Sequence, residues 1–76
     1  MNSSELLRIV EQYTRKSDAG FGDITVTRVP DQKTVFVEQF DGVGRAIMMD
    51  KYRVDGATYC AGYSSRSETV YISRAA

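Results

Sequence analysis

The sequence contains no histidine, one cysteine and one proline among its 76 residues. Without histidine, and with Cys60 as the only thiol, the chain lacks the ligands of a closed tetrahedral zinc site. A single cysteine also excludes a disulfide within the chain. We therefore expect no metal and no cofactor. Because no histidine is present to ionise its thiol, Cys60 is expected to pack as a small hydrophobic side chain inside a strand.

An excess of one charge and long apolar runs are also missing. Ten Lys and Arg residues balance ten Asp and Glu residues, so nucleic-acid binding is possible but disfavoured. No apolar run approaches the ~20 residues that span a bilayer, and no membrane partner is expected. The first residues lack the charged and apolar regions of a signal peptide. Together with the lone cysteine, this pattern predicts a cytoplasmic protein.

No arrangement of residues typical of a catalytic site is present. Asp41 and Asp55 each precede a glycine, and aspartate is common in such turns for local steric and hydrogen-bonding reasons. The stretch Gly42-Val43-Gly44 lacks the further glycines and the following helix of a phosphate-binding loop. We predict that the protein is not an enzyme, and a small-molecule enzyme that uses these acids is the least favoured function.

The first residues predict an amphipathic helix over about residues 3–17. Apolar side chains recur there at the spacing i, i+3, i+4 and i+7, which places them on one helical face. These residues are Leu6, Ile9, Val10 and Tyr13. Asn2 and Glu5 have the spacing of a capping box at the start of the helix, although Ser3 or Ser4 would also serve as the cap.

From Asp23 onward the apolar period changes to two, which predicts an antiparallel sheet over about residues 23–74. The dipeptides Asp41-Gly42 and Asp55-Gly56 favour two-residue type I′ hairpin turns. Residues 45–54 have fair helix propensity, but their position between two hairpin turns favours a strand.

The fold prediction is therefore α+β. One domain over residues 1–76 consists of the N-terminal helix packed on a meander of about five antiparallel strands.

The predicted sheet is wider than one helix can cover. Five strands ~4.8 Å apart span about 24 Å, whereas a helix is about 10–12 Å in diameter. The strand predicted over residues 34–40 is apolar on both faces, with Val35 and Val37 on one and Phe36 and Phe40 on the other. Large apolar patches are rare on soluble monomers, so we expect strong curling of the sheet or a second chain on its open face.

Aromatic and arginine side chains are the candidates for partner binding, because tyrosine and arginine are enriched at protein interfaces. The candidate residues are Phe36, Phe40, Tyr52, Arg53, Tyr59, Tyr63, Arg66, Tyr71 and Arg74. A structural explanation carries similar weight, since tyrosine favours strands and its ring half-covers a small core.

These observations predict a small non-enzymatic protein–protein binding module. Its size and neutral charge resemble those of phage and mobile-element proteins that inhibit or modulate larger complexes. The alternative is a single-stranded nucleic-acid-binding protein that stacks bases on tyrosines beside arginines. The residues for that function are Tyr59, Tyr63 and Tyr71, with Arg53, Arg66 and Arg74.

We also expect a homodimer. A domain this small, without a disulfide or a metal, is near the limit of independent stability. The last predicted strand, Thr69–Ser73, contains no charge or proline that would block pairing if it lies at an edge of the sheet.

Overall fold

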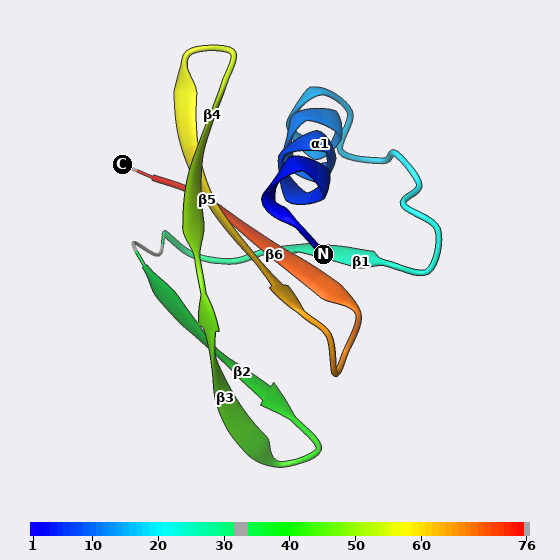
Figure 1. Cartoon of the computed structure of the whole chain (residues 1–76), viewed down its shortest axis with the longest axis vertical. Coiled ribbons are helices and arrows are strands. Elements are labelled where there is room, and N and C mark those ends of the chain that lie inside the picture. The colour runs from blue at the N-terminus through cyan, green and yellow to red at the C-terminus, as the bar shows by residue number, and fades with distance from the viewer. Residues whose placement is uncertain (32–33, 76) are drawn as a thin grey trace.

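An amphipathic helix, α1 (Ser3–Arg15), begins the fold of the computed structural model, which describes residues 1–31 and 34–75 (Figure 1). Asn2 is the N-cap, and its side-chain oxygen accepts a 2.9 Å hydrogen bond from the backbone N–H of Glu5. The predicted helix is confirmed, although it ends two residues earlier, at Arg15 instead of 17. Among the described residues, no helix has the length and apolar character that a membrane crossing needs.

Six strands follow within the described residues. In chain order they are β1 (Thr25–Arg28), β2 (Val35–Phe40), β3 (Val43–Met48), β4 (Asp50–Val54), β5 (Ala57–Ser64) and β6 (Thr69–Arg74). The segment 45–54, for which helix and strand both stayed open, is extended throughout apart from Met49, which separates β3 from β4.

The two Asp-Gly turns have the backbone conformation that the sequence predicts. The φ angles are 53° and 76° at Asp41 and Gly42, and 51° and 82° at Asp55 and Gly56. Two consecutive residues with positive φ define the type I′ turn, whose twist matches that of the flanking strands. The first turn joins β2 to β3 and the second joins β4 to β5.

The strands form two sheets in place of one five-stranded meander. The larger sheet has the order β1-β6-β5-β4, with β1 parallel to β6 and the other pairs antiparallel, and β2 and β3 form a separate antiparallel pair. The α+β class is confirmed. The edge position considered for Thr69–Ser73 does not occur, because β1 pairs alongside β6 and places it inside the sheet.

The sheet lies between the helix and the β2–β3 hairpin (Figure 1). Alternation along β5 directs Ala61 into a core shared with α1 and Cys60 into a second core beneath the hairpin. The first core contains Leu6, Ile9, Val10, Val54, Ala61, Val70 and Ile72, and the second contains Ile47, Met49 and Cys60. The open sheet face, for which either strong curling or a second chain was expected, is therefore covered by the chain's own hairpin.

Gly62 allows the hairpin to approach the sheet closely. A Cβ atom at this position would lie 2.5 Å from the backbone oxygen of Met48 and 2.9 Å from both Ile47 Cγ2 and Met49 Sδ. Real Cβ atoms essentially never come this close to other atoms. The absence of a side chain in the middle of β5 is therefore a requirement of the two-layer packing.

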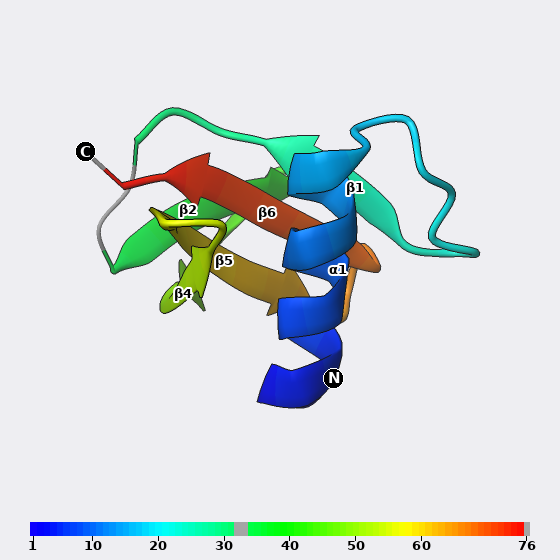
Figure 2. The ribbon, with the colours of Figure 1, turned by 90° about the horizontal axis from the view of Figure 1, so that it is seen from above.

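The helix crosses the sheet at a steep angle. In the view of Figure 2, the axis of α1 runs across the direction of β5 and β6. Its last turn is tied to the β4–β5 turn by two 3.0 Å hydrogen bonds from the Arg15 guanidinium to the Asp55 carboxylate. A helix at this angle covers a short length of each strand, which leaves space beside it over the sheet.

Candidate functional site

A buried carboxylate joins the hairpin to the sheet. Glu38 in β2 is 2% exposed and lies between Phe36 and Phe40 on the side of the strand that faces the sheet. Its side chain accepts hydrogen bonds from Ser64 Oγ at 2.6 Å, Arg66 Nε at 2.7 Å, Ser67 Oγ at 2.6 Å and the hydroxyl of Tyr71. Every donor belongs to β5, β6 or the turn between them, so the cluster fixes the hairpin against that end of the sheet.

Arg66 binds the hairpin backbone as well as the carboxylate. Its Nη2 donates to the backbone oxygens of Glu38 at 2.7 Å and Val43 at 2.9 Å. The guanidinium also lies 5.7 Å from the centre of the Phe40 ring, a cation–π distance. One side chain from the β5–β6 turn thus holds both strands of the hairpin near its tip.

The environment of Glu38 keeps its carboxylate ionised. Burial alone raises the pKa of Glu38, because the charge loses its hydration. Hydrogen bonds from Ser64, Ser67, Tyr71 and Arg66 outweigh this effect and lower the pKa of Glu38 to about 2. A general acid or base works best with a pKa near the operating pH and with access to substrate. Glu38 has neither property, so the cluster acts as an anchor within the fold.

The anchor makes the stability of the protein sensitive to acid. The pKa of Glu38 is about 2 in the folded protein against an ordinary value of 4.5. Its contribution is therefore fully present above pH 4.5 and is lost as the pH falls toward about 2. We expect the difference in unfolding free energy between the wild type and Glu38→Gln to shrink over this range. Urea titrations between neutral pH and about pH 3 measure it, and a difference that stays constant would contradict the assignment.

The tyrosines predicted for partner binding lie on two opposite faces of the sheet. Tyr52, Tyr59 and Tyr63 pack against the core on the helix side, and the hydroxyl of Tyr52 is buried there without a partner among the described residues. Tyr71 points to the hairpin side, where its ring centroid lies 4.6 Å from that of Phe36. Tyr71 therefore faces away from Tyr59 and Tyr63, and the three do not form a common platform for stacking bases.

The remaining predicted residues lie at opposite ends of the molecule. Phe40 and Arg66 meet near the hairpin tip, as described above. Arg53 in β4 and Arg74 at the end of β6 are exposed, and Arg53 donates a 3.3 Å hydrogen bond to the backbone oxygen of Gly56. Of the nine predicted residues, the structure brings together Phe36 with Tyr71 and Phe40 with Arg66. The strand register also places Tyr59 beside Tyr52 and Arg74.

Glu38 is the site residue that the strand pattern did not reveal. A signal for it exists in the sequence: with a period of two, an acid between Phe36 and Phe40 must share their face. A charge on an apolar face needs a buried partner or a position outside the core. Ser64, Arg66 and Ser67 supply such partners, but their proximity depends on the hairpin folding back over β5.

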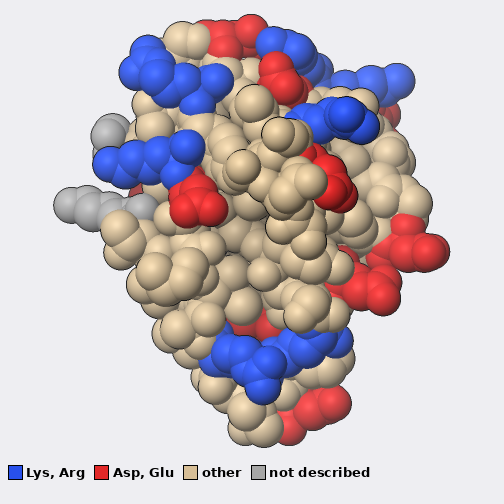
Figure 3. Space-filling model, viewed as in Figure 1, with Lys and Arg blue, Asp and Glu red and all other residues tan. Residues whose placement is uncertain are grey.

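The outer face of the hairpin, which is the side turned away from the sheet, is apolar and exposed. Val35 pairs with Met48 and Val37 pairs with Ala46, so these four side chains share that face. Val37 is 55% exposed and Met48 is 68% exposed. Figure 3, in the orientation of Figure 1, shows an area without charged side chains across the middle of the molecule, with Lys or Arg side chains below it.

The edge of β2 that faces away from β3 has little protection against pairing with another strand. No strand pairs with it among the described residues. It contains no proline, and its only charged side chain, Glu38, is already buried and paired. By contrast, edge strand β4 carries Asp50, Lys51 and Arg53, and edge strand β1 is four residues long. Exposed charged side chains and short length are common protections of an edge, and β2 has neither, since its one charge is buried.

Comparisons of the chain with protein-family models, with curated proteins and with solved structures give no match. Within residues 1–31 and 34–75, no group of three or more Cys, Asp or Glu side chains is placed to hold a metal ion.

Proposed function

We propose that the protein is a non-enzymatic protein-binding module that accepts an extended strand at the open edge of β2. The observation that carries this proposal is the unprotected six-residue edge beside an exposed apolar face. Strand addition uses the main chain for affinity and alternate side chains for specificity. Val35 and Val37 supply such alternate side chains on the outer face of the hairpin. Because Glu38 is already paired, an added strand does not bury an unpaired charge.

The strand that fits this edge in the isolated protein is β2 of a second copy. Two β2 strands related by a two-fold axis pair antiparallel, which extends the hairpin into a four-stranded sheet with the order β3-β2-β2-β3. The sequence VFVEQF suits this arrangement, because its residues favour strands and its outer face carries no charge. The outer faces of the two hairpins then form one continuous apolar surface. A target protein that supplies its own strand would replace the second copy at this edge. In that way the protein would act as an inhibitor or modulator of its target.

Two further parts of the proposal rest on single residues. A role without catalysis is supported by Glu38, whose low pKa and complete set of hydrogen-bond donors suit an anchor. A cytoplasmic location is supported by Cys60, the only cysteine, which is 0% exposed in the second core.

Replacing Val37 with lysine is expected to weaken self-association at least about tenfold, because a lysine on an edge strand opposes pairing with another strand. Sedimentation equilibrium at micromolar concentrations measures the dissociation constant. Thr25→Lys is the matched control, because it places the same charge at an exposed position of edge strand β1. Both variants should retain the wild-type melting temperature at concentrations low enough for all three proteins to be monomeric, since both positions are exposed.

Hydrogen exchange locates the contact. Amide protons of β2 should become more protected as protein concentration rises, whereas those of β4 should not change. If the wild type sediments only as an 8.5 kDa species at high concentration, and β2 exchange is independent of concentration, strand addition by a second copy is excluded.

A further inference from the structure

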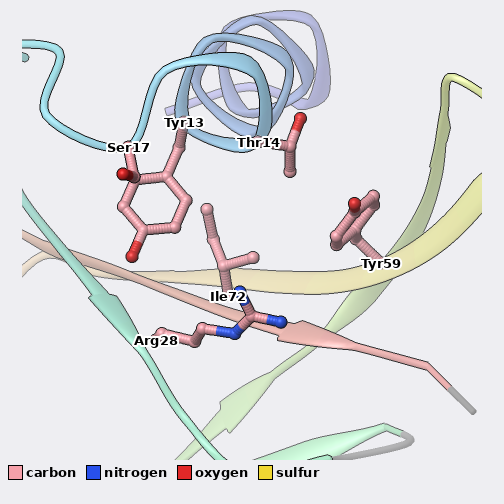
Figure 4. A pocket seen from close by; sticks show the side chains of 6 residues that line it. All are labelled: Tyr13, Thr14, Ser17, Arg28, Tyr59 and Ile72. Carbon is pink, nitrogen blue, oxygen red and sulfur yellow. The ribbon is translucent and has the colours of Figure 1, made fainter.

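A pocket of about 270 Å³ lies between the C-terminal part of α1 and the sheet, on the opposite side of the sheet from the hairpin (Figure 4). It is lined by Tyr13, Thr14, Ser17, Arg28, Tyr59 and Ile72. The sheet supplies the last three from three adjacent strands, β1, β5 and β6, and Arg28 pairs directly with Ile72. The helix supplies Tyr13 and Thr14, and Ser17 follows just after its end.

The lining of the pocket combines polar and apolar groups and carries one charge. Arg28 is its only charged side chain, and it forms no ion pair with any residue in the described part of the chain. Arg74 adds a second cation nearby, because it pairs with Tyr59 across β5 and β6 and so lies on the same face. A cation without an ion-pair partner beside a pocket favours an anionic ligand.

Aromatic rings and an aliphatic side chain enclose the space beside this cation. In Figure 4, the rings of Tyr13 and Tyr59 stand on opposite sides of the pocket, with Ile72 between them and the Arg28 guanidinium below. Flat apolar groups pack well against tyrosine rings and against an aliphatic floor. The volume holds about nine water molecules, and it is smaller than the ~300–1,000 Å³ of sites for drug-sized ligands. A single ring with one small substituent matches this size.

We infer that the pocket binds a small aromatic carboxylate, with its ring between Tyr13 and Tyr59 and its carboxylate on Arg28. A guanidinium presents two parallel N–H donors that match the two oxygens of a planar carboxylate. The ligand's ring packs over Ile72, and the hydroxyl of Ser17 lies at the rim. The same chemistry occurs in a free aromatic acid and in a protein chain that ends in an aromatic residue. The site is independent of the edge of β2, and the two proposals therefore fail or succeed separately.

The test is a titration of the ¹⁵N-labelled full chain with sodium benzoate, followed by two-dimensional NMR. Saturable shifts at Tyr13, Ser17, Arg28, Tyr59 and Ile72 with a dissociation constant of ~1 mM are expected for a ligand of this size. Benzamide, which has the same shape without the charge, should bind at least about tenfold more weakly. N-acetylphenylalanine tests whether the ligand is a protein chain that ends in an aromatic residue. If it binds more tightly than benzoate, such a chain end is favoured over a free aromatic acid.

Arg28→Gln should weaken benzoate binding at least about tenfold without changing the melting temperature, because Arg28 is exposed and makes no ion pair within the described residues. Arg53→Gln is the matched control, since Arg53 is an exposed strand arginine outside the pocket lining. Three results would overturn the inference: no saturable shift up to ~10 mM benzoate, equal binding of benzamide, or unchanged binding by Arg28→Gln.

Discussion

Replacing Gly62 with alanine is expected to lower the melting temperature by about 10 °C or more. Overpacking of a close-packed site costs about 1–3 kcal/mol, and 1 kcal/mol corresponds to about 4–8 °C in a domain of this size. The upper end of this cost applies here, because the nearest atom to the added methyl group is the backbone oxygen of Met48 at 2.5 Å. A backbone atom cannot rotate away as a flexible side chain can, so β3 would have to move off β5.

Gly20→Ala is the control for this change. Gly20 lies outside the helices and strands, and a Cβ atom there meets nothing within 4 Å. Its substitution should leave the melting temperature unchanged or raise it slightly, because alanine restricts the unfolded chain. Thermal unfolding followed by circular dichroism measures both variants. Equal melting temperatures for Gly62→Ala and Gly20→Ala would show that the hairpin does not press on β5 as the structure indicates.

The local parts of this fold are predictable because each depends on residues close in sequence. The period of Leu6, Ile9 and Val10 specifies the helix and its buried face. Each Asp-Gly pair specifies a hairpin turn, since few other dipeptides adopt two positive φ angles at low cost. Both signals also constrain the strands on either side, which is why residues 45–54 are better predicted by their turns than by their helix propensity.

The arrangement of these parts depends on contacts between distant residues. Thr25 pairs with Thr69 in the parallel contact between β1 and β6, and no local pattern specifies which strand β1 joins. The hairpin covers the second face of the sheet because Gly62 leaves room for it. A glycine within a strand pattern is a recognisable sign of close approach by another backbone. Its partner segment, Ile47–Met49, becomes evident only in three dimensions.

The candidate binding surface, too, is predictable in part from local sequence and in part only from contacts between distant residues. Sequence alone places Val35 and Val37 on one face of a strand and Phe36 and Phe40 on the other, and the structure agrees. The phenylalanine face is the buried one, because Phe36 packs against the second core and the Glu38 carboxylate binds Ser64 and Tyr71. The valine face consequently turns outward. The polar anchor on one side of β2 thus explains why the apolar side chains on the other side remain exposed for a partner.

Replacing Glu38 with alanine is expected to have the largest effect of any single substitution in the hairpin, with a fall in melting temperature of more than about 15 °C. The change removes the acceptor for Ser64, Ser67 and Tyr71 and leaves the Arg66 guanidinium without its carboxylate partner. Removing one partner of a buried ion pair destabilises far more than the pair itself stabilises, because the other charge stays desolvated. Thermal unfolding measures the effect. Asp41→Asn is the control, because it removes one negative charge at an exposed position of the same hairpin, and it should have little effect.

A double variant separates the loss of the anchor from a general loss of packing. If the damage in Glu38→Ala comes from the unpaired guanidinium of Arg66, replacing both residues in Glu38→Leu/Arg66→Met should recover a substantial part of the lost melting temperature. Recovery should be incomplete, because Ser64, Ser67 and Tyr71 still lack an acceptor. Hydrogen exchange should show β2 and β3 opening before β5 and β6 in Glu38→Ala, since the anchor holds the hairpin to the sheet. Uniform opening of all strands, with no recovery in the double variant, would show that Glu38 does not anchor the hairpin.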